Sequence, residues 1–302
     1  MKTAPRFFSI FLPFALFCVG IPTFGWGNLG HAEISLNAAR KIPDSMPAFL
    51  RTPAAIARIA YLGPEPDRWK GMAEYALNNA QYPDHEIDLE RIQGLGELPK
   101  GRYEFYKLLY DKRAATTTDP DYYLPEKVGL LPYAAEEVFE RLRAAFRDYR
   151  NLKAANQPAD PVEQDIIFYA GWLGHYAADG SQPLHTTVNY NGWVEANPQG
   201  FTTDQTIHRR FESDFINQNI KASDFESLIG PPHELADTFK DFQQYLWASH
   251  ALVPKVYELD KAKGFDGAGS PEALKFTEER LAAGSRMLLD LWYTAWLQSA
   301  QQ

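Results

Sequence analysis

Apolar residues recur at intervals of three and four along most of the chain after residue 25, and no sustained alternation with a period of two appears. This spacing places the apolar side chains on one face of an α-helix rather than on one face of a strand. The sequence therefore predicts an all-α protein. Helices are expected at residues 30–41, 47–61, 69–79, 102–115, 132–156, 161–179, 206–220, 233–263 and 271–298.

Clusters of proline and glycine at 63–66, 180–183, 197–200 and 230–232 separate these segments, as residues that interrupt helices should. No internal repeat, low-complexity stretch or linker divides the chain. We expect residues 26–302 to form a single helical domain. The last helix shows a typical core-facing stripe, formed by Leu281, Leu288, Leu291, Trp292, Ala295 and Trp296.

The first 25 residues read as an export signal. Lys2 and Arg6 supply the positive start, an apolar stretch follows at 7–21, and Thr23 and Gly25 are small residues at the positions that a signal peptidase reads. An uncleaved membrane anchor is the alternative, but the stretch is short for a spanning helix and contains a proline. Cleavage after Gly25 would make Trp26 the first residue of a secreted or periplasmic protein.

Composition restricts the partners. The formal net charge is −9, and removal of residues 1–25 takes it to −11. A protein with this charge lacks the basic surface that general binding to duplex nucleic acid needs. A polyanionic substrate is still allowed, because bound metal ions reverse the local sign of a site. The one cysteine, Cys18, lies in the signal, so the exported protein can form no internal disulfide.

Histidines and acids form a pattern that suits zinc. His175 and Asp179 are four residues apart on a predicted helix, so both project from one face, and His208 and Glu212 repeat this offset. His185 lies between the two pairs. One such pair alone is usually a solvated salt bridge or a structural histidine. Two pairs with His185 inside 38 positions of largely apolar helix indicate a site for zinc, which accepts imidazole and carboxylate ligands when thiolate is absent.

These residues resemble a known superfamily, the zinc-dependent phospholipases C and the single-strand-specific zinc nucleases typified by the fungal nucleases P-one and S-one. The run from His175 to His185 is the most specific part of the resemblance. The matching segments are WGNLGH at 26–31, PDRW at 66–69, DHEID at 84–88, HYAADGSQPLH at 175–185 and HRRFE at 208–212.

The resemblance implies a helical fold and a cluster of three Zn²⁺ ions that hydrolyses phosphodiesters. It implies that His85, His175, Asp179 and Asp67 hold one zinc, that His185, His208 and Glu212 hold its neighbour, and that the α-amino nitrogen and carbonyl oxygen of Trp26 hold the third zinc with His31, bridged to the first by Asp179. A free α-amino group has a pKa near 7.7 to 8.0, so it yields its proton to a metal more readily than a lysine does.

Asp67 is, by the same resemblance, the candidate catalytic base or the group that orients the attacking water. Arg68 is either a phosphate clamp or part of an ion pair, and we favour the ion pair. Asp88 either orients an imidazole or is a solvated acid at a helix start. His233 and His250 lie outside the pattern and are expected to be structural or surface residues.

Two intervals point toward the nuclease branch, the step from Trp26 to His31 and the 22 residues between His185 and His208. Glu212 and Ile207 depart from the nuclease pattern toward phospholipase C. The leading hypothesis is a nuclease acting on single-stranded nucleic acid. A phospholipase C acting on phospholipid head groups is the runner-up, and a non-catalytic zinc-binding relative is the third.

A nuclease would need an aromatic platform on which an unpaired base stacks. Tyr190 and Trp193, in the loop after His185, are the candidates, with packing of the loop itself as the alternative. Residues 94–127 are longer than the resemblance leads us to expect and are interpreted as an insertion near the mouth of the cleft.

Overall fold

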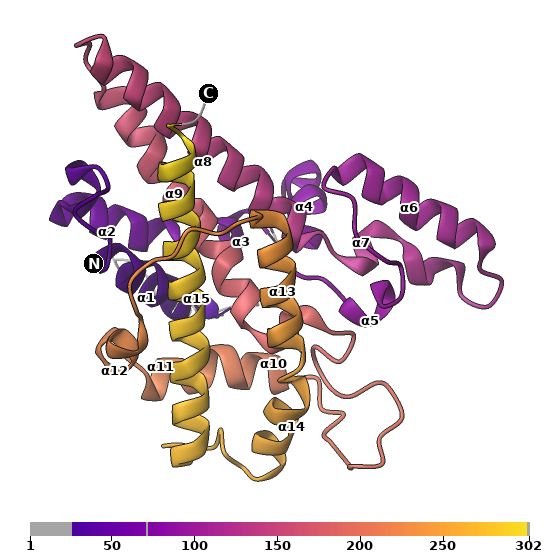
Figure 1. Ribbon diagram of the computed structural model, residues 1–302. Coiled ribbons are helices and arrows are strands. Elements are labelled where there is room, and N and C mark those ends of the chain that lie inside the picture. The colour runs from indigo at the N-terminus through magenta and orange to yellow at the C-terminus, as the bar shows by residue number, and fades with distance from the viewer. Residues whose placement is uncertain (1–25, 71, 301–302) are drawn as a thin grey trace, which may run out of the picture.

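Helix α9 (Asp160–Ser181) lies at the centre of the fold, where it packs against α1 (Gly27–Arg40), α2 (Pro53–Leu62), α8 (Leu131–Ala154) and α15 (Pro271–Gln298) (Figure 1). The structure is a computed structural model that describes residues 26–70 and 72–300. From residue 173 to the end of α9 every residue is buried, as expected of a helix enclosed on all sides. Any polar side chain on this half of α9 must therefore find its partners inside the protein.

The remaining elements are short and surround this central group. Beyond two isolated bridges, Ile87 with Gly129 and Tyr190 with Gly192, the described residues contain no β-structure. The prediction of an all-α protein is confirmed, and one continuous hydrophobic core joins α1 to α15. The other helical segments are η1 (Ala48–Arg51), α3 (Glu65–Trp69), α4 (Tyr75–Gln81), η2 (Tyr82–His85), α5 (Leu89–Ile92), α6 (Arg102–Ala115), η3 (Pro120–Tyr123), α7 (Pro125–Val128), η4 (Pro183–Thr186), α10 (Ile207–Arg209), η5 (Arg210–Phe215), α11 (Ile216–Asn219), α12 (Ala222–Phe225), η6 (Glu226–Leu228), α13 (Thr238–His250) and α14 (Val253–Lys261).

The predicted helices differ from the observed ones where proline or a change in backbone direction intervenes. Helices α6 and α15 have the predicted bounds, and α1, α8 and α9 agree within three residues. The prediction of a single helix at 233–263 was wrong. It is two helices, because Pro254 in the first turn of α14 lacks an N–H group and its ring clashes with the preceding turn.

The prediction of a helix at 69–79 was also wrong. Helix α3 ends at Trp69, since Lys70 is extended with φ −77° and ψ 136°, and α4 begins only at Tyr75. The segment expected at 47–61 is likewise divided, because Thr52 caps α2 by accepting a hydrogen bond from the amide of Ala55. The predicted export signal, residues 1–25, lies outside the described residues.

The segment 94–127 contains α6 and projects from the body of the molecule, at the right of Figure 1. It is held to the body by Arg102, which pairs with Asp84 at 2.7 Å and with Glu137 at 2.8 Å. Asp84 is the residue before His85, so this ion-pair network connects the projecting segment to one of the predicted zinc ligands.

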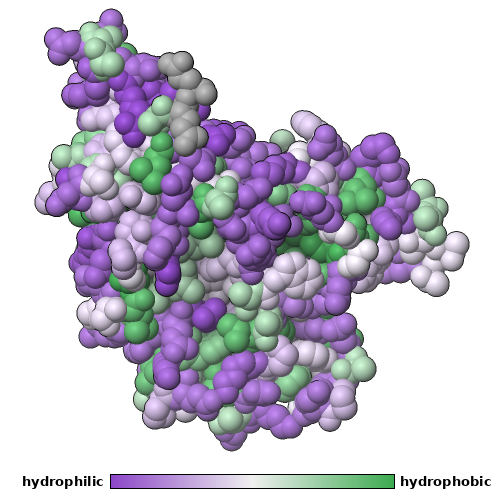
Figure 2. All heavy atoms as spheres, viewed as in Figure 1, coloured by the Kyte–Doolittle hydropathy of each residue, from purple (hydrophilic) through white to green (hydrophobic). Residues whose placement is uncertain are grey.

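The face shown in Figure 2 is mostly hydrophilic, and its hydrophobic residues gather in separate patches. Within the part of the chain that the structure describes, no helix combines the length and the hydropathy needed to cross a membrane.

Small residues allow α1, α2 and α9 to approach closely. A β-carbon built on Gly171 of α9 would lie 2.4 Å from the β-carbon of Leu62 at the end of α2, and one on Gly174 would lie 2.6 Å from the hydroxyl oxygen of Ser35 in α1. Neither contact is possible for real atoms. Glycine at these positions therefore fixes the spacing of the helices that carry the predicted zinc ligands.

Replacing Gly171 by alanine should lower the free energy of unfolding by about 1–3 kcal/mol, because the added methyl group must push α2 away from α9. The gain in helix propensity, up to about 1 kcal/mol, only partly offsets this cost. Denaturant unfolding of Gly171→Ala beside Gly230→Ala provides the measurement, since nothing lies within 4 Å of a β-carbon at position 230. Equal stability of the two variants would contradict the packing argument.

Candidate metal centre

The predicted side-chain ligands come from seven separate elements and meet at the buried end of α9. His31 comes from α1, Asp67 from α3, and His85 from the end of η2. His175 and Asp179 lie one turn apart on α9. His185 is in η4, directly after α9, and His208 and Glu212 are on α10 and η5.

Asp179 is the centre of the cluster. Its side chain is fully buried, and its two oxygens lie 3.1 Å from Nε2 of His175, 3.3 Å from Nδ1 of His85 and 3.4 Å from Nε2 of His31. Nδ1 of His185 is 3.6 Å away. One carboxylate therefore lies against imidazoles from four different elements. It links the ligands predicted for the first zinc to His185, a ligand predicted for its neighbour.

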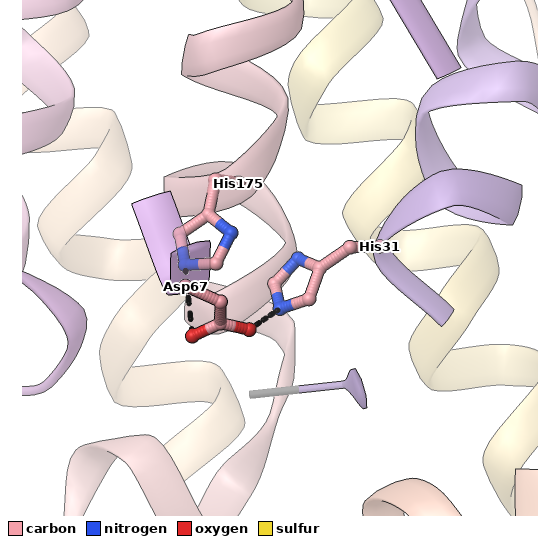
Figure 3. Close-up of side chains that lie close together, drawn as sticks. All are labelled: His31, Asp67 and His175. Atoms are coloured by element: carbon pink, nitrogen blue, oxygen red, sulfur yellow. Dashed lines mark ion pairs between the residues drawn. The ribbon is translucent and has the colours of Figure 1, made fainter. Parts of the chain in front are cut away.

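Asp67, on α3, faces three of these imidazoles. Figure 3 shows its carboxylate turned toward both His31 and His175, at 3.8 Å and 3.9 Å. Its distance to Nδ1 of His85 is 3.7 Å. The rings of His31 and His175 stack with centroids 4.0 Å apart, a contact that depends on the close approach of α1 and α9.

The second group is formed by His185, His208 and Glu212. Nε2 of His208 lies 2.7 Å from the Glu212 carboxylate and 3.2 Å from Nε2 of His185. Glu212 belongs to η5, which is a π-helical turn, a feature that often occurs at functional sites. All three side chains are nearly inaccessible to solvent.

Three sets of buried side chains can each hold a metal ion. In each set, one potential ligand atom per residue lies within 4.8 Å of the others. The sets are His31, Asp67 and His175; His85, His175 and Asp179; and His185, His208 and Glu212. They contain every predicted protein side-chain ligand, and His175 belongs to two of them.

Many of these buried atoms have no hydrogen-bond partner among the described residues. Both nitrogens of His31, both oxygens of Asp67 and both oxygens of Asp179 are in this state, as are Nε2 of His85 and Oε1 of Glu212. A buried polar atom without a partner costs free energy. Cations bound among these atoms would satisfy them, so the residues present fit the ions that the sequence predicts.

Three histidines are oriented by backbone carbonyls. Nδ1 of His175 lies 2.9 Å from the oxygen of Gly63, Nδ1 of His185 lies 2.6 Å from the oxygen of His85, and Nδ1 of His208 lies 3.0 Å from that of Tyr190. A carbonyl oxygen can only accept, so Nδ1 donates in each case. When such a ring is neutral, the lone pair of Nε2 points into the cluster, as a metal ligand requires.

The electrostatics keep the central carboxylate charged. Burial alone would raise the pKa of Asp179, but His175 and His185 outweigh it and hold that pKa well below its ordinary value. Burial lowers the pKa of His31 and of His85. For His185 burial acts in the same direction, yet Asp179 and Glu212 prevail and raise its pKa to about 9.

Trp26 is fully buried against the end of α9 and against Phe211 of η5. Its indole Nε1 lies 2.8 Å from the oxygen of Ala178 and 2.8 Å from the hydroxyl of Ser181, on either side of Asp179 in the sequence. Its ring packs edge-on against Phe211, the neighbour of Glu212. The carbonyl oxygen of Trp26 accepts the first hydrogen bond of α1, from Gly30. The start of the described chain is thus held at the cluster.

The structure also shows the surroundings of four other residues that the sequence analysis considered. Arg68 pairs with Glu65 and lies over the ring of Tyr61, in agreement with the ion-pair interpretation. Asp88 pairs with Arg91 at 2.6 Å and contacts no histidine in the described residues. His233 is exposed and lies near Asp290 and Arg286, and Nδ1 of His250 donates to the oxygen of Thr186.

The two aromatic candidates differ. Trp193 packs against Phe201 and Tyr257 and donates its Nε1 hydrogen to the oxygen of Ala196, so it belongs to the packing of its own loop. Tyr190 is 41% exposed, and its ring is nearly perpendicular to that of His208, with centroids 6.1 Å apart. Tyr190 alone of the pair offers an accessible ring beside the cluster.

The sequence reasoning missed Lys70. Its Nζ lies 3.4 Å from Asp67, and its side chain is 8% exposed. Its charge acts on His31, His85 and His185. The step of three residues from Asp67 could have indicated it, since positions three apart on a helix share a face, but a single lysine near an acid is a common surface pair.

Comparison with known proteins adds no relative. No protein-family model matches the chain, and no curated protein matches it.

Asp179→Asn should bind at least one metal ion fewer than the wild-type protein, because the change removes the charge that four imidazoles share. Zinc at about 100 times its Kd should stabilise the wild-type protein by about 2.7 kcal/mol, and the variant by less. Elemental analysis and thermal unfolding with and without zinc test both statements. Asp44→Asn, at a fully exposed position, is the matched control. An unchanged metal content in Asp179→Asn would contradict the central role of this residue.

Proposed function

We propose that the protein is an exported zinc-dependent phosphodiesterase that hydrolyses single-stranded nucleic acid with three zinc ions, as a member of the zinc phospholipase C and nuclease superfamily. The observation that carries this proposal is the set of three buried groups of potential metal ligands, joined through His175 and Asp179. Export is supported by the signal-like composition of residues 1–25.

Zinc is the metal that best suits these ligands. The groups consist of imidazoles and carboxylates, and residues 26–302 contain no cysteine. Magnesium and calcium prefer sets of oxygen ligands, whereas zinc accepts mixed nitrogen and oxygen sets. When bound, zinc ions would neutralise the phosphodiester charge and lower the pKa of a water molecule enough to supply a nucleophile at neutral pH.

The chain's own residues would place and stabilise the substrate. When ionised, the Asp67 carboxylate has acceptor oxygens only, so it can orient a water molecule or take its proton. Lys70 is a cation fixed beside Asp67, where it can contact a phosphate oxygen as negative charge develops. Asp67 itself lies within 3.9 Å of His31, His85 and His175.

Exposed aromatic rings near the cluster favour nucleic acid as the substrate. Tyr190 is 41% exposed and Tyr82, at the start of η2, is 45% exposed. Unpaired bases stack on such rings, and each stack is worth about 1–3 kcal/mol. Phospholipid is the second candidate, since Glu212 and Ile207 depart from the nuclease pattern toward phospholipase C.

The direct test uses purified protein that begins at Trp26 and is loaded with zinc. It should cleave single-stranded DNA and RNA, and it should lose this activity on treatment with a chelator and regain it when zinc is restored. Phosphatidylcholine is assayed in parallel. Cleavage of phosphatidylcholine alone would sink the nuclease proposal, and inactivity on all three substrates would favour a non-catalytic zinc-binding protein.

Lys70→Gln should reduce kcat on single-stranded DNA by on the order of 100-fold, because a positioned cation near the phosphate is removed. Zinc content should not fall, since Lys70 is not a ligand. Arg68→Gln is the matched control and should retain nearly full activity, because Arg68 is engaged with Glu65 and Tyr61. A Lys70→Gln enzyme as fast as Arg68→Gln would show that Lys70 has no part in the reaction.

A free amino group on Trp26 should be required for the third zinc. Protein that begins at Trp26 should bind three zinc ions, and protein that retains Gly25 should bind two, because an amide nitrogen carries no available lone pair. The zinc-to-protein ratio of the two forms, with His31→Ala as a third sample, measures this difference. Equal ratios for the first two would remove Trp26 from the ligand set.

A further inference from the structure

Tyr257 is a buried tyrosine that lies against the loop between His185 and His208. It belongs to α14, and none of the three groups of potential metal ligands contains it. Its ring packs against Trp193 and Phe201, with ring centroids 5.1 Å and 5.5 Å away. These contacts fix the ring, and with it the direction in which the hydroxyl points.

The hydroxyl of Tyr257 makes two hydrogen bonds to the backbone of that loop. It donates to the oxygen of Asn189, and it accepts from the amide of Gly192 at 3.1 Å. Burial raises the pKa of this phenol, so the hydroxyl keeps the proton that it donates. One side chain of α14 therefore holds both ends of residues 189–192, which we call the 189–192 segment.

The two residues inside the 189–192 segment both contact His208. The oxygen of Tyr190 accepts from Nδ1 of His208 at 3.0 Å, and Oδ1 of Asn191 accepts from the backbone amide of His208 at 3.4 Å. Helix α10, which carries His208, has only three residues and continues into the π-helical turn of η5. Because so short a helix has little stability of its own, the direction of the His208 ring depends on these two contacts.

The other nitrogen of His208 faces the second group of ligands. Nε2 lies 2.7 Å from the Glu212 carboxylate and 3.2 Å from Nε2 of His185. The partner that orients a ligating imidazole also decides which nitrogen is available to the metal. For His208 that partner is the carbonyl of Tyr190, and Tyr257 holds the segment that contains this carbonyl.

The preceding part of the loop has an anchor of its own. Glu90, on α5, accepts hydrogen bonds from the hydroxyl of Thr187 and from the amide of Val188, the latter at 3.1 Å. Removing the hydroxyl of Tyr257 should therefore leave residues 187–188 in place. The change should be confined to the 189–192 segment and to the imidazole that this segment holds.

We propose that Tyr257 is a positioning residue for the metal-binding group of His185, His208 and Glu212, and that it acts by holding the 189–192 segment against His208. The proposal rests on metal binding by this group, which is part of the proposed function, and it is the same for nucleic acid and for phospholipid as substrate. Loss of a group that orients a metal ligand lowers metal affinity by about 10- to 100-fold. Because Tyr257 acts through the backbone of another segment, we expect a decrease of about 10-fold.

The test is ¹¹³Cd NMR of protein that begins at Trp26 and is loaded with cadmium in place of zinc. Each bound ion gives its own signal, whose chemical shift depends on its ligands. The signal that His208→Ala abolishes or displaces belongs to the group that contains His208. Tyr257→Phe should shift this signal and leave the others in place, and competition with a chelator should show an affinity for this ion that is about 10-fold lower.

Tyr133→Phe is the matched control. Tyr133 is almost fully buried and donates its hydroxyl hydrogen to the oxygen of Pro99 at 2.9 Å, so the change removes the same kind of hydrogen bond. It should keep every cadmium signal of the wild-type protein. Asn191→Ala is a second variant, which removes the other contact of the segment with His208, and it should shift the same signal as Tyr257→Phe does.

An unchanged signal and affinity in Tyr257→Phe would overturn the proposal and leave the proposed function intact. A shift of all the signals alike would also overturn it, because that result would show a general role of Tyr257 in folding. If Tyr257→Phe gives no folded protein, Asn191→Ala decides, and a wild-type spectrum of that variant would count against the proposal. A wild-type protein that binds no metal ion would overturn the proposed function as well.

Discussion

The structure depends on one buried carboxylate and the imidazoles around it. Asp179 lies on the fully enclosed half of α9, and four histidines from separate elements approach it within 3.6 Å. An ionised group in such a place is tolerated only where opposite charge or donors compensate its lost hydration. Cations held by the cluster would supply that compensation, and they would also join α1, α9, η2 and η4 into one unit.

The packing of the helices serves the same cluster. Glycines in α9 let α1 and α2 approach to distances that a side chain would forbid, and this approach stacks His31 on His175. The carbonyl of Gly63, just after α2, then orients the His175 ring. The tight packing of the apolar helices and the placement of the polar side chains therefore depend on each other. A shift of α2 would also displace the carbonyl that orients His175.

The polar atoms that lack partners concentrate where the ligands meet. Most proteins pair their buried polar groups, so a concentration of unpaired ones usually marks a functional requirement. Lys70 lies beside this cluster as a charged group that the ions would not engage. The site thus presents a cation that the proposed reaction can use at a phosphate.

The sequence by itself determined the helical class, the long helices and the two spaced pairs of histidine and acid, because these depend on periodicity within one segment. The sequence analysis missed the break between α13 and α14, although Pro254 marks the place. Only the tertiary structure decided that His31, Asp67 and His85 converge on α9, that Trp193 packs inward while Tyr190 stays accessible, and that Lys70 reaches the cluster. Those facts depend on contacts between residues far apart in the chain, and no local spacing encodes how closely two helices pack.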